Sequence, residues 1–390
     1  MYWTVHLEGG PQRVNHAAVA VGHKIYSFGG YCSGEGFEVI GKIDVHVLDT
    51  DTLRWCPVHY TEAQAAPFKR YGHAVVEYKG KIYLWGGRND LNASNILHCF
   101  DVDDRSWSIP VTGGNIPKSV DGHSACVIGD YMYIFGGYEE EAEKLVQTLY
   151  RLNFNTFNWE EVITFGDPPS SRDFHTASAI GNCIYIFGGR SSENMLNGQI
   201  EPEFYCNKIV YLNTQSMKWV TPEVYGIPPC GRRSHSAAVY ENELYIIGGY
   251  NALTQEHHND IYKFSPEKNA WIEMHAKGDG PCPRRRHCSC VVGNRLFLFG
   301  GSRSPPSDES IFLDISEGFQ KLIDHSDLYV LDFFPSLKTL CQLKIIDFQL
   351  NINRLPRFLM QEIRAMTTNN NISRNDFFPR KDFGVFVFSA

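Results

Sequence analysis

Six copies of one pattern of hydrophobic and polar residues follow each other along the chain. In each copy a short apolar run begins near a histidine, passes through a turn, continues as a second apolar run and ends in two glycines. Residues 175–189 show the pattern most clearly, with the turn at Gly181-Asn182. Two apolar runs joined by such a turn predict a β-hairpin. The histidines are His16, His73, His123, His175, His235 and His287, and each stands 13 residues before the first glycine of its pair, at Gly29, Gly86, Gly136, Gly188, Gly248 and Gly300.

Two further strands are predicted in each copy. An apolar segment after the glycine pair ends in a polar residue, and in five copies a tryptophan follows that residue six positions later. These pairs are Asp49 and Trp55, Asp101 and Trp107, Asn153 and Trp159, Asn213 and Trp219, and Ser265 and Trp271. Four short strands in about 50 residues are typical of one β-propeller blade, and the period and the glycine pair resemble the kelch repeat. Length varies most just after the glycine pair, where a binding surface is expected.

The sixth copy lacks its fourth strand. Lys338 stands where the tryptophan is due, whereas Trp3 opens an apolar run, residues 3–7, ahead of the first copy. We expect this N-terminal strand to complete the last blade, because the pairing closes the ring and removes its open sheet edges. The predicted fold class is therefore all-β. A six-bladed kelch β-propeller closed by an N-terminal strand spans residues 1–334, and a short helical segment follows it.

Residues that recur in nearly every copy are expected to serve the fold, whereas residues found in one copy are free to serve function. An arginine three positions before the histidine recurs in five copies, and Val120 replaces it in the third. We expect these arginines to pair with neighbouring carboxylates or loop carbonyls, and the six histidines to be structural too. The arginines are Arg13, Arg70, Arg172, Arg232 and Arg284.

The singular residues gather at one opening of the expected channel. In an up-and-down blade the start of the first strand and the end of the second lie at the same rim. Residues just before each histidine and just after each glycine pair therefore surround one mouth, where Asp121 and Asp173 are the main acidic residues. The basic and aromatic residues there are Arg88, Arg190, Arg233, Arg285, Arg286, Tyr31, Tyr71, Tyr138, Phe174 and Tyr250.

A concave, aromatic and locally basic mouth fits a small anionic group. Arginine suits a carboxylate because its planar fork can bind both oxygens. In the alternative interpretation, these arginines form salt bridges that hold neighbouring blades together. We favour a binding role for Arg190 and Arg233.

Composition narrows the class of protein. Of 390 residues, 43% are apolar and 13% aromatic, which is enough for a large core, and the net charge of −8 argues against general nucleic-acid binding. No run is long enough for a membrane span and residues 1–6 lack the features of a signal peptide, so we expect a cytoplasmic and/or nuclear protein.

The candidate chemistry is limited as well. The eleven cysteines are expected to be reduced, and Cys288-Ser289-Cys290 has no second pair at zinc-site spacing. We therefore expect no metal and no cofactor. The histidines fall in the structural pattern and no nucleophile motif accompanies them, so no catalytic residues are expected and the protein is not predicted to be an enzyme.

Residues 335–366 change from a strand to a helix pattern. Ser336 is a suitable N-cap, and Leu337, Cys341 and Ile345 then share one helical face. A second helix is expected from Leu355-Pro356 onward. Helices this short need a surface to cover, so they either pack on the propeller or insert into a groove of a partner.

The helical segment carries two motifs. Ser336–Ile345 resembles a BC box, S-L-x-x-x-C-x-x-x-[AILV], which docks on elongin C, and Leu355–Ile363 resembles the cullin-2 box, φ-P-x-x-φ-x-x-x-φ with φ apolar. Both motifs follow a six-copy kelch ring in this order. Through about residue 374 the chain is similar to the kelch-repeat substrate receptors of cullin-2 RING ubiquitin ligases.

That resemblance implies a non-catalytic receptor that binds C-terminal degrons, typically ended by glycine, and presents their proteins for ubiquitination and proteasomal degradation. It implies elongin B/C and cullin-2 as partners, with the RING subunit reached through cullin-2, and no membrane or nucleic acid. The implied contacts with the degron carboxylate are Arg190, Arg233 and Ser234. Among the residues that the blade topology places at the mouth, we expect Arg88, Tyr138, Phe174, Tyr250 and Arg285 to form the pocket rim. The implied contacts with elongin C are Leu337, Cys341 and Ile345, and those with cullin-2 are Leu355, Pro356, Leu359 and Ile363.

Two positions depart from that family. Relatives often have another arginine a few residues past Arg190, where this chain reads Ser191-Ser192-Glu193-Asn194-Met195, and Val120 replaces the repeat arginine. Residues 367–390 are expected to form an irregular tail. The alternative function is a kelch scaffold for chromatin or cytoskeletal proteins that has no part in a ligase.

Overall fold

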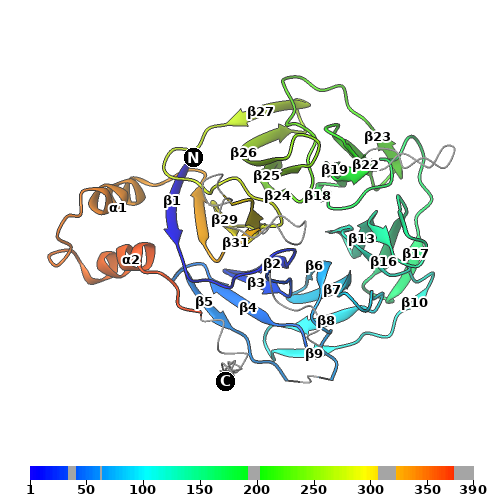
Figure 1. Cartoon of the computed structure of the whole chain (residues 1–390), viewed down its shortest axis with the longest axis horizontal. Coiled ribbons are helices and arrows are strands. Elements are labelled where there is room, and N and C mark those ends of the chain that lie inside the picture. Colours follow the sequence, from blue (N-terminus) through cyan, green and yellow to red (C-terminus); the bar gives the residue numbers. More distant parts are fainter. Residues whose placement is uncertain (34–40, 62–63, 192–202, 306–321, 373–390) are drawn as a thin grey trace, which may run out of the picture.

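A computed structural model describes residues 1–33, 41–61, 64–191, 203–305 and 322–372 of the chain. Its strands form a ring of antiparallel sheets around a central channel, with two helices outside the ring (Figure 1). In the first five copies of the repeat, four strands pair in chain order, as expected for up-and-down blades. The architecture fits a kelch β-propeller.

The larger sheets of the described residues are these. The first contains β2 (Ala17–Val21), β3 (Lys24–Phe28), β4 (Val45–Asp49) and β5 (Arg54–Pro57). The second contains β6 (Tyr71–Tyr78), β7 (Lys81–Arg88), β8 (His98–Asp101) and β9 (Ser106–Ser108). The third contains β12 (Ser124–Ile128), β13 (Tyr131–Phe135), β16 (Leu149–Asn153), β17 (Asn158–Glu161) and the added β10 (Gly113–Gly114). The fourth contains β18 (Thr176–Ile180), β19 (Cys183–Phe187), β22 (Val210–Asn213) and β23 (Lys218–Val220). The fifth contains β24 (Ser236–Tyr240), β25 (Glu243–Asn251), β26 (Glu256–Ser265) and β27 (Ala270–Met274). The sixth contains β28 (Cys288–Val292), β29 (Arg295–Phe299), β32 (Leu328–Asp332) and β1 (Tyr2–Leu7).

Short strands extend the sheets at one rim. They are β11 (Val120–Asp121), β14 (Tyr138–Glu139), β15 (Lys144–Leu145), β20 (Arg190–Ser191), β21 (Phe204–Tyr205), β30 (Ser302–Arg303) and β31 (Ile323–Asp324). Strands β11, β14, β20 and β30 contain positions just before a histidine or just after a glycine pair, and β15, β21 and β31 pair with three of them. These strands therefore build the mouth that the sequence predicted to carry the singular residues.

The N-terminal strand closes the ring as predicted. Strand β1 pairs antiparallel with β32, and Trp3 lies opposite Leu331. The side chain of Trp3 is buried against the fifth sheet, in a cluster that includes Ile247 and Ile261. Because β1 and β32, the first and last strands of the ring, lie side by side in one sheet, detaching either strand exposes the core of the sixth sheet.

The hydrophobic core lies between successive sheets. In the first five blades, the indole ring of the repeat tryptophan packs on an aromatic residue of the preceding sheet. Trp159 lies 5.6 Å from Trp85, between ring centroids, and Trp219 lies 5.4 Å from Phe135. The same contact joins the first sheet to the sixth, with Trp55 5.0 Å from Phe299. Such aromatic contacts bury large areas, so the regular tryptophan of the sequence is a residue of the blade interface.

The repeated arginines and histidines are buried, in agreement with the structural role predicted for them. Arg70, Arg172, Arg232 and Arg284 each donate a hydrogen bond to the carbonyl of the first glycine of their own pair, at 2.8–3.2 Å. The histidines join neighbouring blades: the Nε2 atoms of His175, His235 and His287 lie 2.7–3.0 Å from a hydroxyl of the preceding blade, on Ser124, Thr176 and Ser236. Burial holds the pKa of all six repeat histidines far below the usual value, so they are neutral.

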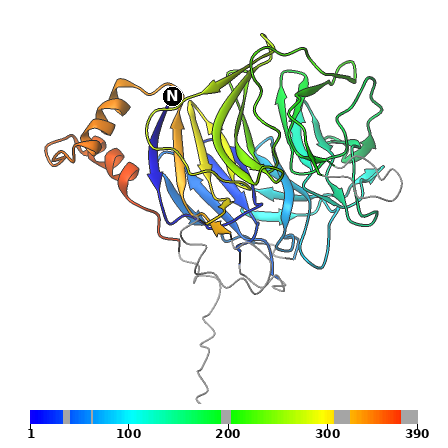
Figure 2. The ribbon, with the colours of Figure 1, turned by 45° about the horizontal axis from the view of Figure 1, so that its top comes forward.

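Two helices, α1 (Leu337–Asp347) and α2 (Arg357–Thr367), form a hairpin that we call the helical arm. The arm projects from the ring beside β1 (Figures 1 and 2). Ser336 is the N-cap of α1, as predicted, and its Oγ accepts a hydrogen bond of 3.1 Å from the Thr339 amide. Helix α2 lies against β1, whereas α1 lies against α2. Neither helix of the described residues has the length and hydropathy required to cross a membrane.

Candidate functional site

A closed ring of backbone hydrogen bonds forms the floor of the mouth. The residue directly before each repeat histidine has a positive φ, between 51° and 66°, and its amide donates to the carbonyl of the equivalent residue in the preceding blade. In order around the ring these residues are Asn15, Gly72, Gly122, Phe174, Ser234 and Arg286, and the amide of Asn15 donates to Arg286 to close the circle. The N–O distances are 2.7–3.2 Å. A pocket of about 130 Å³ lies within this ring, lined by the ring residues and by the repeat histidines next to them.

The backbone is strained at Phe174, because a bulky residue there occupies the left-handed region (φ 51°). Such strained residues are typical of binding sites, where the surrounding structure holds them in place. Glycine fills the equivalent positions 72 and 122. A Cβ on Gly122 would lie 3.3 Å from the Phe174 ring, so the aromatic side chain covers this part of the floor. Phe174 is thus a floor residue and does not lie on the outer rim.

The structure brings the predicted mouth residues together. Above the floor, each position two before a histidine pairs with the position just after the glycine pair of the same blade. The six pairs are Val14 and Tyr31, Tyr71 and Arg88, Asp121 and Tyr138, Asp173 and Arg190, Arg233 and Tyr250, and Arg285 and Ser302. The same backbone arrangement therefore presents six different pairs of side chains to the mouth.

One side of the mouth contains ion pairs. Arg190 binds both carboxylate oxygens of Asp173, at 3.1 Å from Nε to Oδ1 and more closely from Nη2 to Oδ2, and its Nη1 lies 3.3 Å from Glu203. Arg88 lies 3.1 Å from Glu140. Arg88 therefore joins the second blade to the third, as the alternative interpretation expects, whereas Arg190 binds carboxylates of its own blade.

The same side holds a carboxyl group with a strongly raised pKa. Burial raises the pKa of Asp121 to about 7, and the nearby Asp173 and Glu140 add to this effect, against the attraction of Arg88. Tyr138, predicted as a rim residue, pairs with Asp121 across β11 and β14. This half of the mouth is therefore close to neutral.

The opposite side of the mouth carries uncompensated positive charge. Within the described ranges, Arg233, Arg285 and Arg286 have no carboxylate within ion-pair distance. The Arg285 guanidinium lies 4.3 Å from the centre of the Tyr250 ring, and that of Arg233 lies 6.0 Å from it. Arg286 donates a hydrogen bond of 2.6 Å to the Tyr31 hydroxyl. Three cations thus lie against two aromatic rings, in a half-buried setting where charge is poorly screened.

Two buried nitrogen atoms on this side have no hydrogen-bond partner in the part of the chain that the structure describes: Arg285 Nε and His257 Nε2. An arginine Nε can only donate, so Arg285 Nε lacks an acceptor among the described residues, whereas the Nε2 atom of neutral His257 can donate or accept according to its tautomer. Burial lowers the pKa of Arg285 to about 10, and the positive charges of Arg286 and Arg233 lower it further. Arg285 remains protonated at neutral pH, and an anion placed beside it would remove this unfavourable electrostatic energy.

The sequence identified part of this basic side. It predicted Arg233 and Ser234 as carboxylate ligands and Tyr250 and Arg285 as rim residues, and all four lie at the basic side or in the floor below it. It placed Arg286 at the mouth without a role. It did not identify His257, which belongs to no repeated position and reaches the mouth because β25 and β26 extend beyond the glycine pair.

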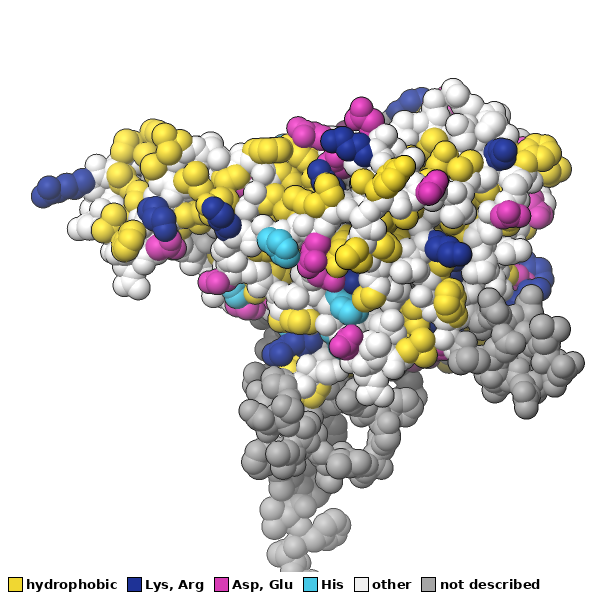
Figure 3. All heavy atoms as spheres, turned by 90° about the horizontal axis from the view of Figure 1, so that it is seen from above, with side chains coloured by type: hydrophobic (Ala, Val, Ile, Leu, Met, Phe, Trp, Pro, Cys, Tyr) yellow, Lys and Arg dark blue, Asp and Glu magenta, His cyan; other side chains and the backbone are white. Residues whose placement is uncertain are grey.

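The helical arm exposes the motif residues of α1 and buries one of α2. Leu337 is 77% exposed, Cys341 is exposed and Ile345 is half-buried. Several other large apolar side chains are exposed on or beside the arm: Phe334, Phe348, Leu350 and Phe358. Figure 3 shows hydrophobic side chains gathered on this projection, at the left of the view.

In the second motif, Pro356 is exposed and Leu355 and Leu359 are half-buried, but Ile363 is only 4% exposed. The face of α2 that carries Ile363 lies against β1, and the contact of Ile363 with cullin-2 stays a prediction. The surface available to a partner on the arm consists of α1, the loop between the helices and the start of α2.

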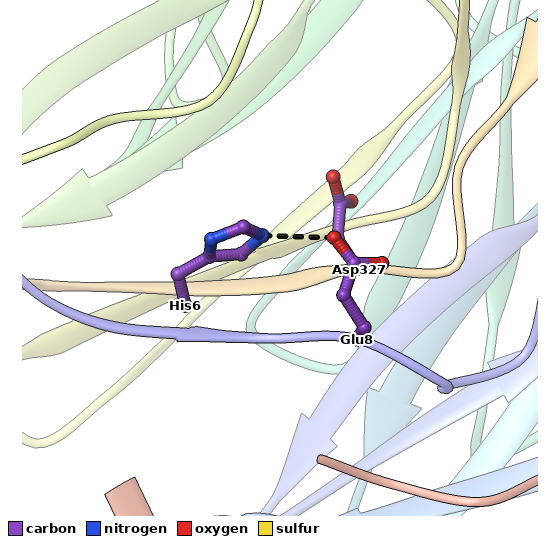
Figure 4. Close-up of side chains that lie close together, drawn as sticks. All are labelled: His6, Glu8 and Asp327. Atoms are coloured by element: carbon purple, nitrogen blue, oxygen red, sulfur yellow. Dashed lines mark hydrogen bonds and ion pairs between the residues drawn. The ribbon is translucent and has the colours of Figure 1, made fainter. Parts of the chain in front are cut away.

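A histidine and two carboxylates lie together away from the mouth. His6 Nε2 lies 3.0 Å from Glu8 Oε1, beside Asp327 (Figure 4). Both oxygens of Asp327 already accept hydrogen bonds from Arg284, at 2.6 and 2.7 Å. A cation would have to displace this buried arginine, so the cluster is explained as part of the blade structure.

Comparisons with known proteins place these features in context. A family model described as the KLHDC2/KLHL20/DRC7 Kelch-repeats domain matches residues 15–93 and 72–301. Kelch domain-containing protein 3 of Homo sapiens is 48% identical over 379 residues, which cover 95% of this chain and 97% of that protein. The protein of the same name from Mus musculus shows the same identity and coverage.

More distant similarity extends to a second group. Host cell factor 2 of Homo sapiens is 29% identical over 249 residues, which cover 60% of this chain and 31% of that protein. This similarity is confined to part of each chain.

Proposed function

The chain belongs to the kelch-repeat family of Kelch domain-containing protein 3, and we propose that it is a non-catalytic substrate receptor of a cullin-2 RING ubiquitin ligase. In this proposal the propeller mouth binds the C-terminal carboxylate of a substrate, with glycine as the last residue. The helical arm binds elongin B/C and cullin-2, and the RING subunit joins through cullin-2. The substrate is thereby presented for ubiquitination and proteasomal degradation, in the cytoplasm and/or the nucleus.

The observation that carries the proposal is the uncompensated positive charge of Arg233, Arg285 and Arg286 at the mouth. A carboxylate placed between Arg233 and Arg285 would provide the acceptor that Arg285 Nε lacks and would balance the charge that lowers its pKa. Arg190 is expected to keep Asp173 as its partner, because releasing it would leave a carboxylate that is 1% exposed without a counter-charge. The carboxylate contacts in this proposal are thus Arg233 and Arg285, with Ser234 beneath them in the floor.

The floor supports a small terminal residue. Its ring of backbone hydrogen bonds surrounds a pocket of only about 130 Å³, and the last residue of a peptide is expected to lie there, beside Phe174 and Arg286. A terminal glycine brings its carboxylate close to this floor without a side chain to accommodate. Clefts that combine an apolar wall with a few polar anchors are typical of small-ligand sites.

Amidation of the peptide tests the carboxylate. We expect a pool of glycine-ended decapeptides with a free carboxylate to bind, and the same pool with a C-terminal amide to bind about 10²–10⁴ times more weakly, because two charge-assisted hydrogen bonds of about 1.5–3 kcal/mol each are lost. Fluorescence anisotropy with the full chain measures both affinities. Equal affinity of the two pools would show that the mouth does not read a terminal carboxylate.

The arm is tested by removing two exposed side chains of α1. We expect Leu337→Ala with Cys341→Ala to abolish co-purification of elongin B/C, because a helix that inserts into a groove loses its apolar anchors. Both residues are exposed, so the free energy of unfolding and the peptide affinity should stay within error. Lys344→Ala is the matched control, since Lys344 is 69% exposed at a position that the motif leaves open and its ion pair with Asp347 lies within α1. Undiminished elongin binding by the double variant would reject the arm as the ligase contact.

The similarity to Host cell factor 2 favours one alternative, a kelch scaffold that binds chromatin or cytoskeletal proteins without a ligase. The exposed apolar residues of α1 would then have another protein partner. A pull-down with the full chain distinguishes the two functions, because only the ligase receptor is expected to retain elongin B/C and cullin-2 together. Recovery of other proteins without these two would favour the scaffold.

A further inference from the structure

We propose that residues 368–372, with Arg54 and Gly9, form a clamp that sets the direction in which the helical arm leaves the propeller. The sequence assigned these five residues to an irregular tail. In the structure they lie across the junction between the first sheet and strand β1 of the sixth sheet. The consequence for ubiquitin transfer rests on the proposed function, whereas the clamp itself does not.

Asn370 is the centre of the clamp. Its Oδ1 accepts a hydrogen bond of 2.9 Å from the Trp55 amide, and its Nδ2 donates one of 3.2 Å to the Leu53 carbonyl. The side-chain amide thus pairs with the outer edge of β5 as a neighbouring strand would. The backbone amide of Asn370 donates to the Glu8 carbonyl at 2.8 Å. One buried residue therefore ties both ends of the closed ring to the segment that follows α2.

Arg54 holds the end of α2. Its Nη2 donates a hydrogen bond of 3.0 Å to the Ala365 carbonyl, and its Nη1 donates to the Thr368 carbonyl at 2.5 Å. The last carbonyls of a helix have no partner within the helix, and a positive charge near them is favourable. Arg54 belongs to β5, so the C-terminal end of α2 is attached to the first sheet of the propeller.

Gly9 shows how closely the segment lies on the ring. It has a φ of 77°, and a Cβ at this position would lie 1.9 Å from the Asn370 carbonyl oxygen. The Ile372 amide donates to the Gly9 carbonyl at 2.9 Å. Met366 and Ile372 also pack against the core cluster that contains Val5 and Trp55. Any larger residue at position 9 would push the clamp away from the propeller.

Helix α1 depends on α2 for its position. The contacts between the helices include a 2.6 Å hydrogen bond from Gln342 to Glu362 and an ion pair of 2.9 Å from Lys338 to Glu362. A groove of about 580 Å³ lies between the helices and the sixth sheet, lined in part by Thr4, Arg295 and Asp332. The arm is thus fixed mainly through α2, which packs on β1 along its length and is held by the clamp at its C-terminal end.

In the proposed receptor, the mouth holds the substrate and the arm holds the ligase. The angle of the arm then decides where substrate lysines lie relative to the ubiquitin-loaded enzyme. Loss of the correct position reduces the rate of such a reaction without weakening either binding step. Asn370 and Arg54 are therefore positioning residues for ubiquitin transfer.

Pulsed electron paramagnetic resonance on the full chain tests the clamp directly. Spin labels replace two exposed residues, Lys268 in a propeller turn and Arg354 in the loop of the arm. We expect one narrow distance distribution for the otherwise wild-type chain, a broad one for Asn370→Ala, and a narrow one for the control Asn371→Ala, whose side chain is exposed. Gly9→Ala is expected to broaden the distribution as Asn370→Ala does. A narrow, unshifted distribution in the Asn370→Ala and Gly9→Ala variants, with the propeller folded, would overturn the proposal.

A ubiquitination assay with purified cullin-2 ligase components and a glycine-ended reporter adds a functional readout. For Asn370→Ala we expect kcat to fall by about tenfold, with KM for the reporter and the affinity for elongin B/C unchanged. A variant that merely unfolded would instead lose both binding steps. If the wild-type chain supports no transfer at all, the proposed function fails, while the distance measurement still decides the clamp.

Discussion

Replacing both Arg233 and Arg285 with alanine is expected to reduce the affinity for a free-carboxylate peptide by about 10²–10⁴, and each single replacement by about 10–150-fold. The reason is geometric. Both guanidinium groups lie around the Tyr250 ring, and neither has a carboxylate within ion-pair distance among the described residues, so removing them breaks no direct internal ion pair. Anisotropy with the glycine-ended peptide pool measures the affinities, and thermal unfolding establishes that the propeller remains folded.

Two other mouth arginines provide the comparison. Arg88→Ala removes the same charge from a guanidinium that is paired with Glu140, and we expect its effect on peptide affinity to remain within about threefold. Arg190→Ala is expected to lower stability, because it leaves the buried Asp173 without its partner. Unchanged peptide affinity in the Arg233 and Arg285 double variant would exclude the basic side of the mouth as the binding site.

Acid is expected to unfold the propeller sharply near pH 5. Burial holds the pKa of the six repeat histidines far below 6.5, to about 3 for His73, His123 and His287. A group whose pKa is lower in the folded than in the unfolded protein stabilises the fold fully above its unfolded pKa. This stability is lost as the pH falls toward the folded pKa. Each of the three histidines with a folded pKa of about 3 costs about 2 kcal/mol at pH 5, so these three cost about 6 kcal/mol, and the other three act in the same direction; the stability of a typical domain is about 5–15 kcal/mol.

The raised pKa of Asp121 has the opposite sign. A carboxyl with a folded pKa of about 7 contributes stability at low pH and loses it as pH rises through 7, so its protonation offsets about 3 kcal/mol of the histidine effect between pH 7 and pH 5. Urea unfolding at pH values from 5 to 8 measures the slope of the free energy of unfolding. We expect His73→Gln to reduce that slope and His59→Gln, at an exposed histidine, to leave it unchanged. A flat profile between pH 8 and pH 5 would contradict the neutral buried ring.

The repeat determined much of the fold in advance. A fixed interval between His and Gly-Gly, and a regular tryptophan, specify the strands and the blade interface, because every copy must satisfy the same packing with its neighbours. Trp3 indicated the pairing of β1 with β32, since an incomplete last copy requires a strand from elsewhere. Ser336 likewise marked the start of α1, because its hydroxyl caps the helix locally.

The sequence repeat did not show which charged side chains pair with each other. Arg190 and Arg233 look alike in the sequence, but Arg190 forms direct ion pairs with Asp173 and Glu203, whereas Arg233 lies over the Tyr250 ring without one. His257 and Asn370 fall outside every repeat, and each acquires its role from residues that are distant in the chain.

By itself, the sequence determined the repeat, the closure of the ring and which residues gather at one mouth, because these follow from spacing and from the direction of each strand. Only the tertiary structure decided which mouth arginines are free of carboxylate partners, that Ile363 is covered and that residues 368–372 hold the arm. The physical reason is that charge compensation and burial depend on distances between side chains from different blades, and those distances exist only once the ring has closed.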